Sequence, residues 1–123
     1  MSVKEQVIEV LVQRSMLQWA LKLLDRQRSG GDIHIFSLDF ASALIANMLH
    51  SAITLEALER QPRMAKEALT SLLLMLKEPA TVPTSVLMHV LIGLSYMSKE
   101  RFAGVLEETR FVDKVSDFVE VYS

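Results

Sequence analysis

Glycine and proline interrupt this chain at only three places, and that spacing limits its possible folds more than any other feature. The breaks fall at Gly30-Gly31, around Pro62, and between Pro79 and Pro83. Both residue types break regular structure, glycine through its backbone freedom and proline through its ring and missing amide hydrogen. Between the breaks, apolar residues recur at steps of three and four, which is the period of a helix. The sequence therefore predicts an all-α fold.

The length and composition of the chain predict one domain. The chain has 123 residues, half of them apolar, which is enough for one compact core and too little for two ordinary domains. We therefore expect a single helical domain over residues 1–123. The formal net charge of -2 shows no basic excess, so no nucleic-acid partner is expected. The absence of cysteine excludes disulfides, a thiolate nucleophile and cysteine-ligated zinc.

Targeting and membrane segments are not expected either. The N-terminus turns charged at Lys4 and Glu5 and lacks the apolar run of a signal peptide. The most apolar stretches, residues 72–76 and 86–97, are short, and Lys77 and His89 bound or interrupt them. We therefore expect a cytoplasmic protein without membrane insertion.

The apolar period predicts where the helices lie. Residues 3–24 fit either one kinked helix or two abutting helices. Ser37 is expected to cap the next helix, and Pro62 to precede a helix over residues 63–77. Thr84 or Ser85 is expected to cap a helix that extends to residue 97, and a short polar helix follows from residue 98. The last helix is expected to place these side chains together: Val112, Val115, Phe118, Val119 and Tyr122.

Two of the predicted helices look like copies of each other. The triplets that begin at Leu44 and Leu91 lie 47 positions apart, each in the middle of an apolar helix. The segments that begin at Leu17, Ala68 and Lys114 correspond loosely in the same way. A period of roughly 40 to 47 residues is typical of armadillo and HEAT repeats. We therefore expect an armadillo/HEAT-like α-solenoid of two to three repeats, with a globular helical bundle as the alternative.

Patterns of catalytic or metal-binding residues are missing. His34, His50 and His89 are far apart, and none has a second histidine or a carboxylate four residues further on. The acidic pair Glu107-Glu108 diverges on a helix and has no apolar pocket suggested nearby. No Gly-x-Ser-x-Gly elbow or strand-linked phosphate loop occurs. We expect no enzyme activity, no cofactor and no metal.

Other residues fit both a binding surface and a plain structural role. Trp19 suits a packed position as well as an exposed interface anchor. Arg26 and Arg28 close a helix, where positive charge favours the C-terminal dipole, and His50 ends the next helix. His89, inside an apolar helix, is expected to be partly buried or to face a groove. The methionines suit an adaptable groove, but core filling is the favoured interpretation for Met48, Met64, Met75, Met88 and Met97.

The run from Leu38 to Leu49 resembles an armadillo-repeat helix, because Ala43-Leu44 is followed by Asn47 in an Ala-Leu-x-x-Asn-Leu pattern. The order of the segments at residues 17–25, 36–44, 68–76 and 110–115 is similar to the armadillo region of the LisH-domain armadillo-repeat proteins of cilia and basal bodies. The resemblance covers about residues 14–121. It implies a non-enzymatic scaffold at the base of cilia, acting in ciliary stability and signalling with microtubule-associated partners.

The resemblance also implies a binding surface. Asn47 corresponds to the asparagine with which many armadillo proteins bind the main chain of an extended peptide. Ala43 stands where peptide-binding armadillo proteins carry a tryptophan, and Leu94 where a second asparagine would fall. An importin-like ladder is therefore not expected, and a side-chain-specific or edge-to-edge contact is favoured. The residues expected to bind a partner are Asn47, Ala43, His50, His89 and Trp19.

Three further expectations concern the natural context of the chain. The LisH dimerisation motif is not visible, which suggests a fragment or a reduced relative. A short solenoid leaves an end face without a cap, which predicts self-association or docking onto a longer chain. The expected location is the ciliary base, basal body or centriole. The alternative is a general cytosolic armadillo/HEAT-like adaptor in a trafficking or regulatory complex.

Overall fold

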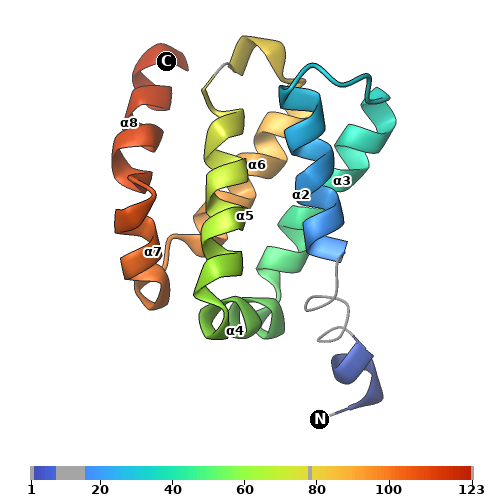
Figure 1. Cartoon of the computed structure of the whole chain (residues 1–123), viewed down its shortest axis with the longest axis vertical. Helices are drawn as coiled ribbons and strands as arrows, with labels where there is room; N and C mark the ends of the chain where they lie inside the picture. Colours follow the sequence, from blue (N-terminus) through green and yellow to red (C-terminus); the bar gives the residue numbers. More distant parts are fainter. Residues whose placement is uncertain (1, 8–15, 78, 123) are drawn as a thin grey trace.

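The computed structural model describes residues 2–7, 16–77 and 79–122, and every regular element in them is helical (Figure 1). The all-α prediction is confirmed for this part of the chain. Residues 3–7 are helical, and single 3-10 turns, η1 (Pro79–Thr81) and η2 (Glu100–Phe102), precede α6 and α7. The α-helices that follow are α2 (Met16–Arg28), α3 (Ile35–His50), α4 (Ala52–Arg60), α5 (Pro62–Met75), α6 (Thr84–Met97), α7 (Ala103–Glu108) and α8 (Phe111–Tyr122).

The longer helices form two layers. Helices α2, α5 and α8 lie side by side in Figure 1, and α5 contacts both of the others. Helices α3 and α6 lie behind α2 and α5, and they make the most extensive helix contact among the described residues. Helix α4 follows α3 after a bend of 85° and leads the chain back to α5. The two layers enclose one core.

The core is centred on α5, which has buried side chains along its whole length. Helix α5 contacts α2, α4, α6, α7 and α8. Leu69 and Leu72 on α5 are fully buried, as are Leu24 on α2 and Ile45 on α3. Burying a leucine or isoleucine side chain of this kind stabilises the fold by about 1.5–3 kcal/mol. Apolar contact across the layers therefore holds the helices together.

The turn between α2 and α3 explains the first glycine break. The amides of Gly30 and Gly31 donate to the carbonyls of Gln27 and Arg26, at 3.1 and 2.7 Å, which closes the helix end. Gly30 has a φ of 88°, a conformation that suits glycine. At Gly31, a Cβ would lie 2.7 Å from the Arg26 carbonyl oxygen, so a side chain would collide there.

Two predicted helix caps are wrong. Helix α3 is capped by His34, whose ring Nδ1 accepts a hydrogen bond of 3.2 Å from the amide of Phe36. Ser37 therefore lies inside the first turn and is not the cap. Helix α6 begins directly after Pro83, which has no side chain able to accept a hydrogen bond, so neither Thr84 nor Ser85 is its cap.

Helix α5 begins at Pro62, one residue before the predicted start at residue 63, so Pro62 lies in its first turn. A proline costs nothing there, since the amides of that turn have no helical acceptor. The expected end at residue 77 is two residues too late, as α5 ends at Met75.

The structure shows which of the predicted apolar positions are buried. Met88 is 57% exposed, so its core prediction is wrong, whereas Met64, Met75 and Met97 are buried. On α8, Phe118 is buried and Val115 is half-buried, but Val112 and Val119 are exposed. The apolar side chains at residues 8, 11, 12 and 122 lie outside the side chains that the structure describes.

Helices α3 and α6 approach closely at Gly93. A Cβ on Gly93 would lie 3.2 Å from Cδ1 of Leu49 on α3 and 3.5 Å from Cδ1 of Leu72 on α5. Because hydrogen replaces a side chain there, the backbone of α6 can lie against both neighbours. The close contact places the outer surfaces of α3 and α6 beside each other.

Four polar contacts between separate elements join residues at nearly constant distances along the sequence. They link α2 with α5, α3 with α6, α5 with α7, and α4 with η2. The two partners lie 42 to 47 positions apart in these four contacts, and a fifth contact, between Asp39 and His89, joins residues 50 positions apart. The pairs are Asp25 and Ser71, Ser42 and His89, Lys66 and Glu108, and Glu59 and Arg101.

Candidate functional site

Four of the five residues predicted to bind a partner line one hollow between α3 and α6. Ala43, Asn47 and His50 come from α3, where steps of four and three place them on one stripe, and His89 comes from α6. The hollow has a volume of about 230 Å³. Ala46, Ile92 and Tyr96 complete its lining. Helix packing therefore gathers residues that are up to 53 positions apart in the sequence.

The fifth predicted residue, Trp19, lies outside the hollow. It is on α2, is half-exposed, and packs edge-on against Phe40 of α3 with ring centroids 6.5 Å apart. Phe40 precedes Ala43 by three residues, so the two side chains are neighbours on the outside of α3. Trp19 is therefore both packed and exposed, and it extends the same surface beyond the hollow.

The sequence interpretation missed the exposed apolar residues around the hollow. Phe36 is 76% exposed and Phe40 is 58% exposed, on the same stripe of α3 as Asn47. On α6, Met88 and Ile92 are exposed at a spacing of four. We refer to this surface as the α3–α6 face and define it by Trp19, Phe36, Phe40, Ala43, Asn47, His50, Met88, His89, Ile92 and Tyr96.

A buried hydrogen bond fixes His89 at the edge of the hollow. Its Nδ1 lies 2.9 Å from Oγ of Ser42, a side chain that is only 1% exposed. The single hydroxyl hydrogen of Ser42 is donated to the carbonyl oxygen of Asp39, at 2.9 Å. Ser42 therefore contacts both the Asp39 carbonyl oxygen and Nδ1 of His89, and these two contacts hold the imidazole ring against α3.

Asp39 contributes a carboxylate beside this histidine. Its Oδ1 is buried, has no hydrogen-bond partner, and lies 3.9 Å from Nδ1 of His89. The rest of the side chain is accessible, since 44% of its surface is exposed. At the other end of the hollow, the rings of His50 and Tyr96 lie 5.0 Å apart. Polar side chains therefore lie at both ends of the hollow.

The position on α6 where a second asparagine would fall lies in the core. Leu94, 47 positions after Asn47, is buried in the core, so that position does not reach the surface. Ser95 next to it is exposed, and its hydroxyl donates to the carbonyl of Ile92 at 2.6 Å. A row of asparagine side chains therefore does not continue from α3 onto α6.

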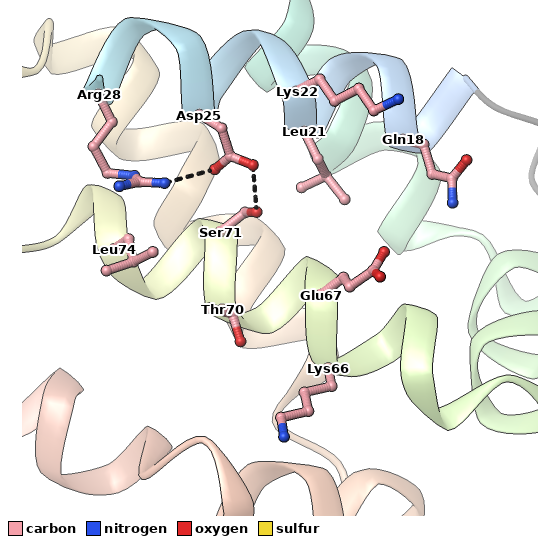
Figure 2. A pocket seen from close by; sticks show the side chains of 10 residues that line it. All are labelled: Gln18, Leu21, Lys22, Asp25, Arg28, Lys66, Glu67, Thr70, Ser71 and Leu74. Atoms are coloured by element: carbon pink, nitrogen blue, oxygen red, sulfur yellow. Dashed lines mark hydrogen bonds and ion pairs between the residues drawn. The ribbon is translucent and has the colours of Figure 1, made fainter. Parts of the chain in front are cut away.

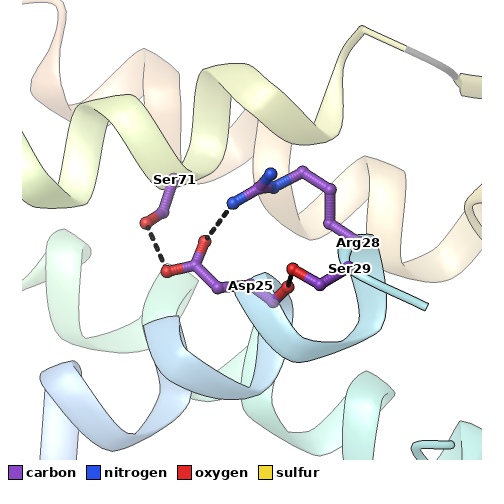
Figure 3. Close-up of polar contacts among 4 residues, drawn as sticks. All are labelled: Asp25, Arg28, Ser29 and Ser71. Atoms are coloured by element: carbon purple, nitrogen blue, oxygen red, sulfur yellow. Dashed lines mark hydrogen bonds and ion pairs between the residues drawn. The ribbon is translucent and has the colours of Figure 1, made fainter. Parts of the chain in front are cut away.

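A second, larger hollow of about 520 Å³ lies between α2 and α5 (Figure 2). Three of its five charged side chains, Asp25, Arg28 and Lys66, contact other described residues, whereas Lys22 and Glu67 do not. Asp25 accepts from Arg28 at 3.2 Å and from Ser71 at 3.3 Å (Figure 3). Lys66 points away from this pair in Figure 2 and contacts Glu108 of α7 at 2.6 Å. These contacts connect α2 with α5 and α5 with α7. The α3–α6 face is the better candidate for recognition because large apolar side chains are exposed on it.

The described residues contain no group of three or more histidine, aspartate or glutamate side chains placed to hold a metal ion. Among the described residues, no single helix is both long and apolar enough to span a membrane, and the α3 and α4 pair passes that test only when joined across its bend of 85°.

Comparisons with protein families, with curated proteins and with solved structures find no match to this chain.

Proposed function

We propose that this chain is a non-enzymatic protein-interaction module that holds a segment of another protein on the α3–α6 face. The observation that carries the proposal is the exposure of Phe36, Phe40 and Met88 on two helices that pack closely together. Contiguous apolar surface on a folded domain commonly marks an interaction site. Aromatic and methionine side chains are also enriched where proteins bind each other.

The architecture proposed for the module is an armadillo-like array of two to three units. In a stacked array, equivalent helices are neighbours, so contacts join residues about one repeat apart. Two polar contacts join such equivalent helices, Asp25 with Ser71 and Ser42 with His89, at separations of 46 and 47 residues, and they support this arrangement. So does the order of helices, because α2, α5 and α8 adjoin in one layer and α3 and α6 in the other. A helical bundle without repeats has no reason to keep a constant separation.

The mode of binding follows from the polar groups in the hollow. The Asn47 amide has donors and an acceptor, which suits the main chain of an extended segment. Since Leu94 is buried, no second asparagine on α6 can continue such a row. The side chains of the partner must therefore supply most of the specificity, through the aromatic groups at one end and the His89 edge at the other.

The proposed setting is a scaffold at the ciliary base or basal body, with microtubule-associated partners, and it rests on the armadillo resemblance alone. A general cytosolic adaptor is the alternative. Self-association through an end of the array, where Val112 and Val119 are exposed on α8, is a further possibility that the same experiment addresses.

The test is crosslinking mass spectrometry on the tagged protein in ciliated cells. A Phe36→Ser/Phe40→Ser variant removes two exposed apolar groups from the face, and an Asn47→Ala variant removes its amide. A Val112→Ser/Val119→Ser variant is the matched control, because it makes the same kind of change on α8. We expect the two face variants to lose partners that the control keeps. Partners retained by both face variants would contradict the proposal.

The identity of the captured proteins separates the two settings. Centriolar or axonemal proteins lost from the face variants would support the ciliary scaffold, and vesicle or regulatory proteins would support the general adaptor. Crosslinks between two copies of the chain that disappear in the α8 variant would assign self-association to that end. Circular dichroism melting of each purified variant checks that the fold persists.

A further inference from the structure

We propose that Ser29 accepts a phosphate from a protein kinase that selects arginine-containing substrates, and that this phosphate loosens the contact between α2 and α5. The inference is independent of the α3–α6 face, because it concerns the turn that follows α2. It gives a second role to Arg26 and Arg28, whose position at a helix end is also explained by the helix dipole.

The charge pattern before Ser29 is the first argument. Arg26 stands three residues before it, and Arg28 directly before it. Kinases distinguish their substrates through complementary charge, and carboxylates bind guanidinium groups with two parallel hydrogen bonds. None of the other serines and threonines of the sequence has an arginine or a lysine three residues before it. The pattern therefore singles out Ser29.

The turn after α2 makes this serine accessible. Arg26, Arg28 and Ser29 are exposed, and so are the two glycines that follow them. No residue from 26 to 29 is buried, so the last turn of α2 can open without removing an apolar side chain from the core. The two glycines have no side chains to obstruct an approaching enzyme. The segment can therefore enter the substrate groove of a kinase as an extended chain.

The reaction joins the Ser29 hydroxyl to the terminal phosphate of magnesium-bound ATP. Oγ of Ser29 attacks the γ-phosphorus, the bond from that phosphorus to the departing ADP breaks, and the hydroxyl proton passes to the catalytic aspartate of the kinase. In the folded chain this hydroxyl donates to the carbonyl oxygen of Asp25 at 2.8 Å (Figure 3). Because the phosphate replaces the hydroxyl hydrogen, the modified chain loses this hydrogen bond.

Charged groups surround the position of the added phosphate. A hollow of about 510 Å³ lies beside Ser29, and Lys22, Arg26 and Asp25 contribute to its lining. Lys22 and Arg26 lie one helical turn apart, and neither forms an ion pair with another described residue. A phosphate, with a charge of about -2, is attracted by these two cations and repels the Asp25 carboxylate.

The phosphate affects α5 through Asp25. The carboxylate of Asp25 accepts from Arg28 at 3.2 Å and from Ser71 of α5 at 3.3 Å. A phosphate one turn further along α2 repels this carboxylate and competes with it for Arg28. Negative charge at the C-terminal end of α2 is also unfavourable with the helix dipole. The polar contact from α2 to α5 is therefore weaker in the modified chain.

The site is tested by incubating the purified whole chain with magnesium-ATP and activated calmodulin-dependent protein kinase II, an arginine-directed enzyme. Mass spectrometry of the products locates the phosphate. We expect it on Ser29 and not on Ser98, which is also exposed but has Ser95 three residues before it. The variant Ser29→Ala should remain unmodified. Phosphate on Ser98 in place of Ser29, or no phosphate at all, would overturn the proposed site.

Two arginine variants test the charge pattern. Arg26→Gln should lower kcat/KM of the kinase for the chain about tenfold, the size expected for one charge-assisted contact. Arg63→Gln is the matched control, because Arg63 is exposed on α5 and is far from Ser29 in the sequence. The control should leave kcat/KM unchanged. Equal rates for the two variants would show that Arg26 does not direct the kinase and would overturn that part of the inference.

Thermal melting of the modified and unmodified chains tests the loosening. We expect phosphorylation at Ser29 to lower Tm by about 3–6 °C. The decrease should be smaller in Ser71→Ala, which already lacks the hydrogen bond from α5 to Asp25. An unchanged Tm, or an equal decrease in Ser71→Ala, would overturn the loosening of α2 from α5.

Discussion

Oγ of Ser42 and Nδ1 of His89 lie 2.9 Å apart and join α3 to α6 across 47 positions of sequence. The contact is largely shielded, since Ser42 is buried and His89 is partly buried. It lies at the edge of the hollow that contains Asn47. The same pair of side chains thus connects the two helices and orients the ring that the α3–α6 face presents.

Replacing Ser42 by alanine is expected to lower the free energy of unfolding by about 1–2 kcal/mol, because Nδ1 of His89 loses its hydrogen-bond partner. Urea denaturation followed by circular dichroism measures this value. Ser95→Ala is the matched control, since that exposed serine donates only to Ile92 within its own helix, at 2.6 Å. The control should change stability by less than about 0.5 kcal/mol. Equal losses in the two variants would show that the link between α3 and α6 contributes nothing.

Replacing Gly93 by valine is expected to destabilise the fold by about 1–3 kcal/mol, because the added atoms meet the buried side chains of Leu49 and Leu72. Gly104→Ala is the comparison, because no atom lies within 4 Å of the position of its added Cβ. That change should stabilise α7 by up to about 1 kcal/mol through helix propensity. Thermal melting of both variants checks the prediction, and a Gly93 variant as stable as the native chain would contradict the close approach.

Replacing Asp25 by alanine should cost about 1 kcal/mol, because Asp25 contacts Arg28 on its own helix and Ser71 on α5. Asp113→Ala removes a similar contact with Arg110 that is exposed and lies within one helix. Its expected cost is below about 0.5 kcal/mol. The two changes in free energy of unfolding can be compared in urea. A larger cost at Asp113 would mean that the contact between α2 and α5 has no special value.

Replacing Leu72 by alanine should lower the free energy of unfolding by about 2–5 kcal/mol, because this fully buried side chain packs at the centre of the core. Val119→Ala, at an exposed apolar position of α8, should change it by less than about 0.5 kcal/mol. Denaturant unfolding monitored by the fluorescence of Trp19 gives both values. A small effect at Leu72 would contradict the placement of α5 between the two layers.

The fold was predictable where apolar spacing and backbone breaks agree. Gly30-Gly31 and Pro62 mark real helix boundaries, because each acts through its own backbone geometry and needs no distant partner. Ser37 misled the prediction, since His34 offers an acceptor one turn earlier and the helix begins before the serine. Local sequence shows which residues are able to cap a helix, but the position of the first turn decides which residue does so.

The candidate site was predictable only in part, because α3 and α6 are apolar around most of their circumference. Periodicity then cannot separate the buried stripe from the exposed one, and Met88 was assigned to the core for that reason. Asn47 was found through its resemblance to an armadillo asparagine. Asp39 and Ser42 were missed, since their importance comes from His89, which approaches them only when the helices pack.

Helix α5 contacts five other helices, and these contacts determine which helices unfold locally first. Amide groups exchange with solvent fastest where few neighbours must separate first. The backbone of α5 should therefore exchange last, and the outer helix α8 much earlier. Helix α6 contacts α5 directly, and α3 contacts both α6 and α2. The α3–α6 face can therefore keep its shape while α8 frays.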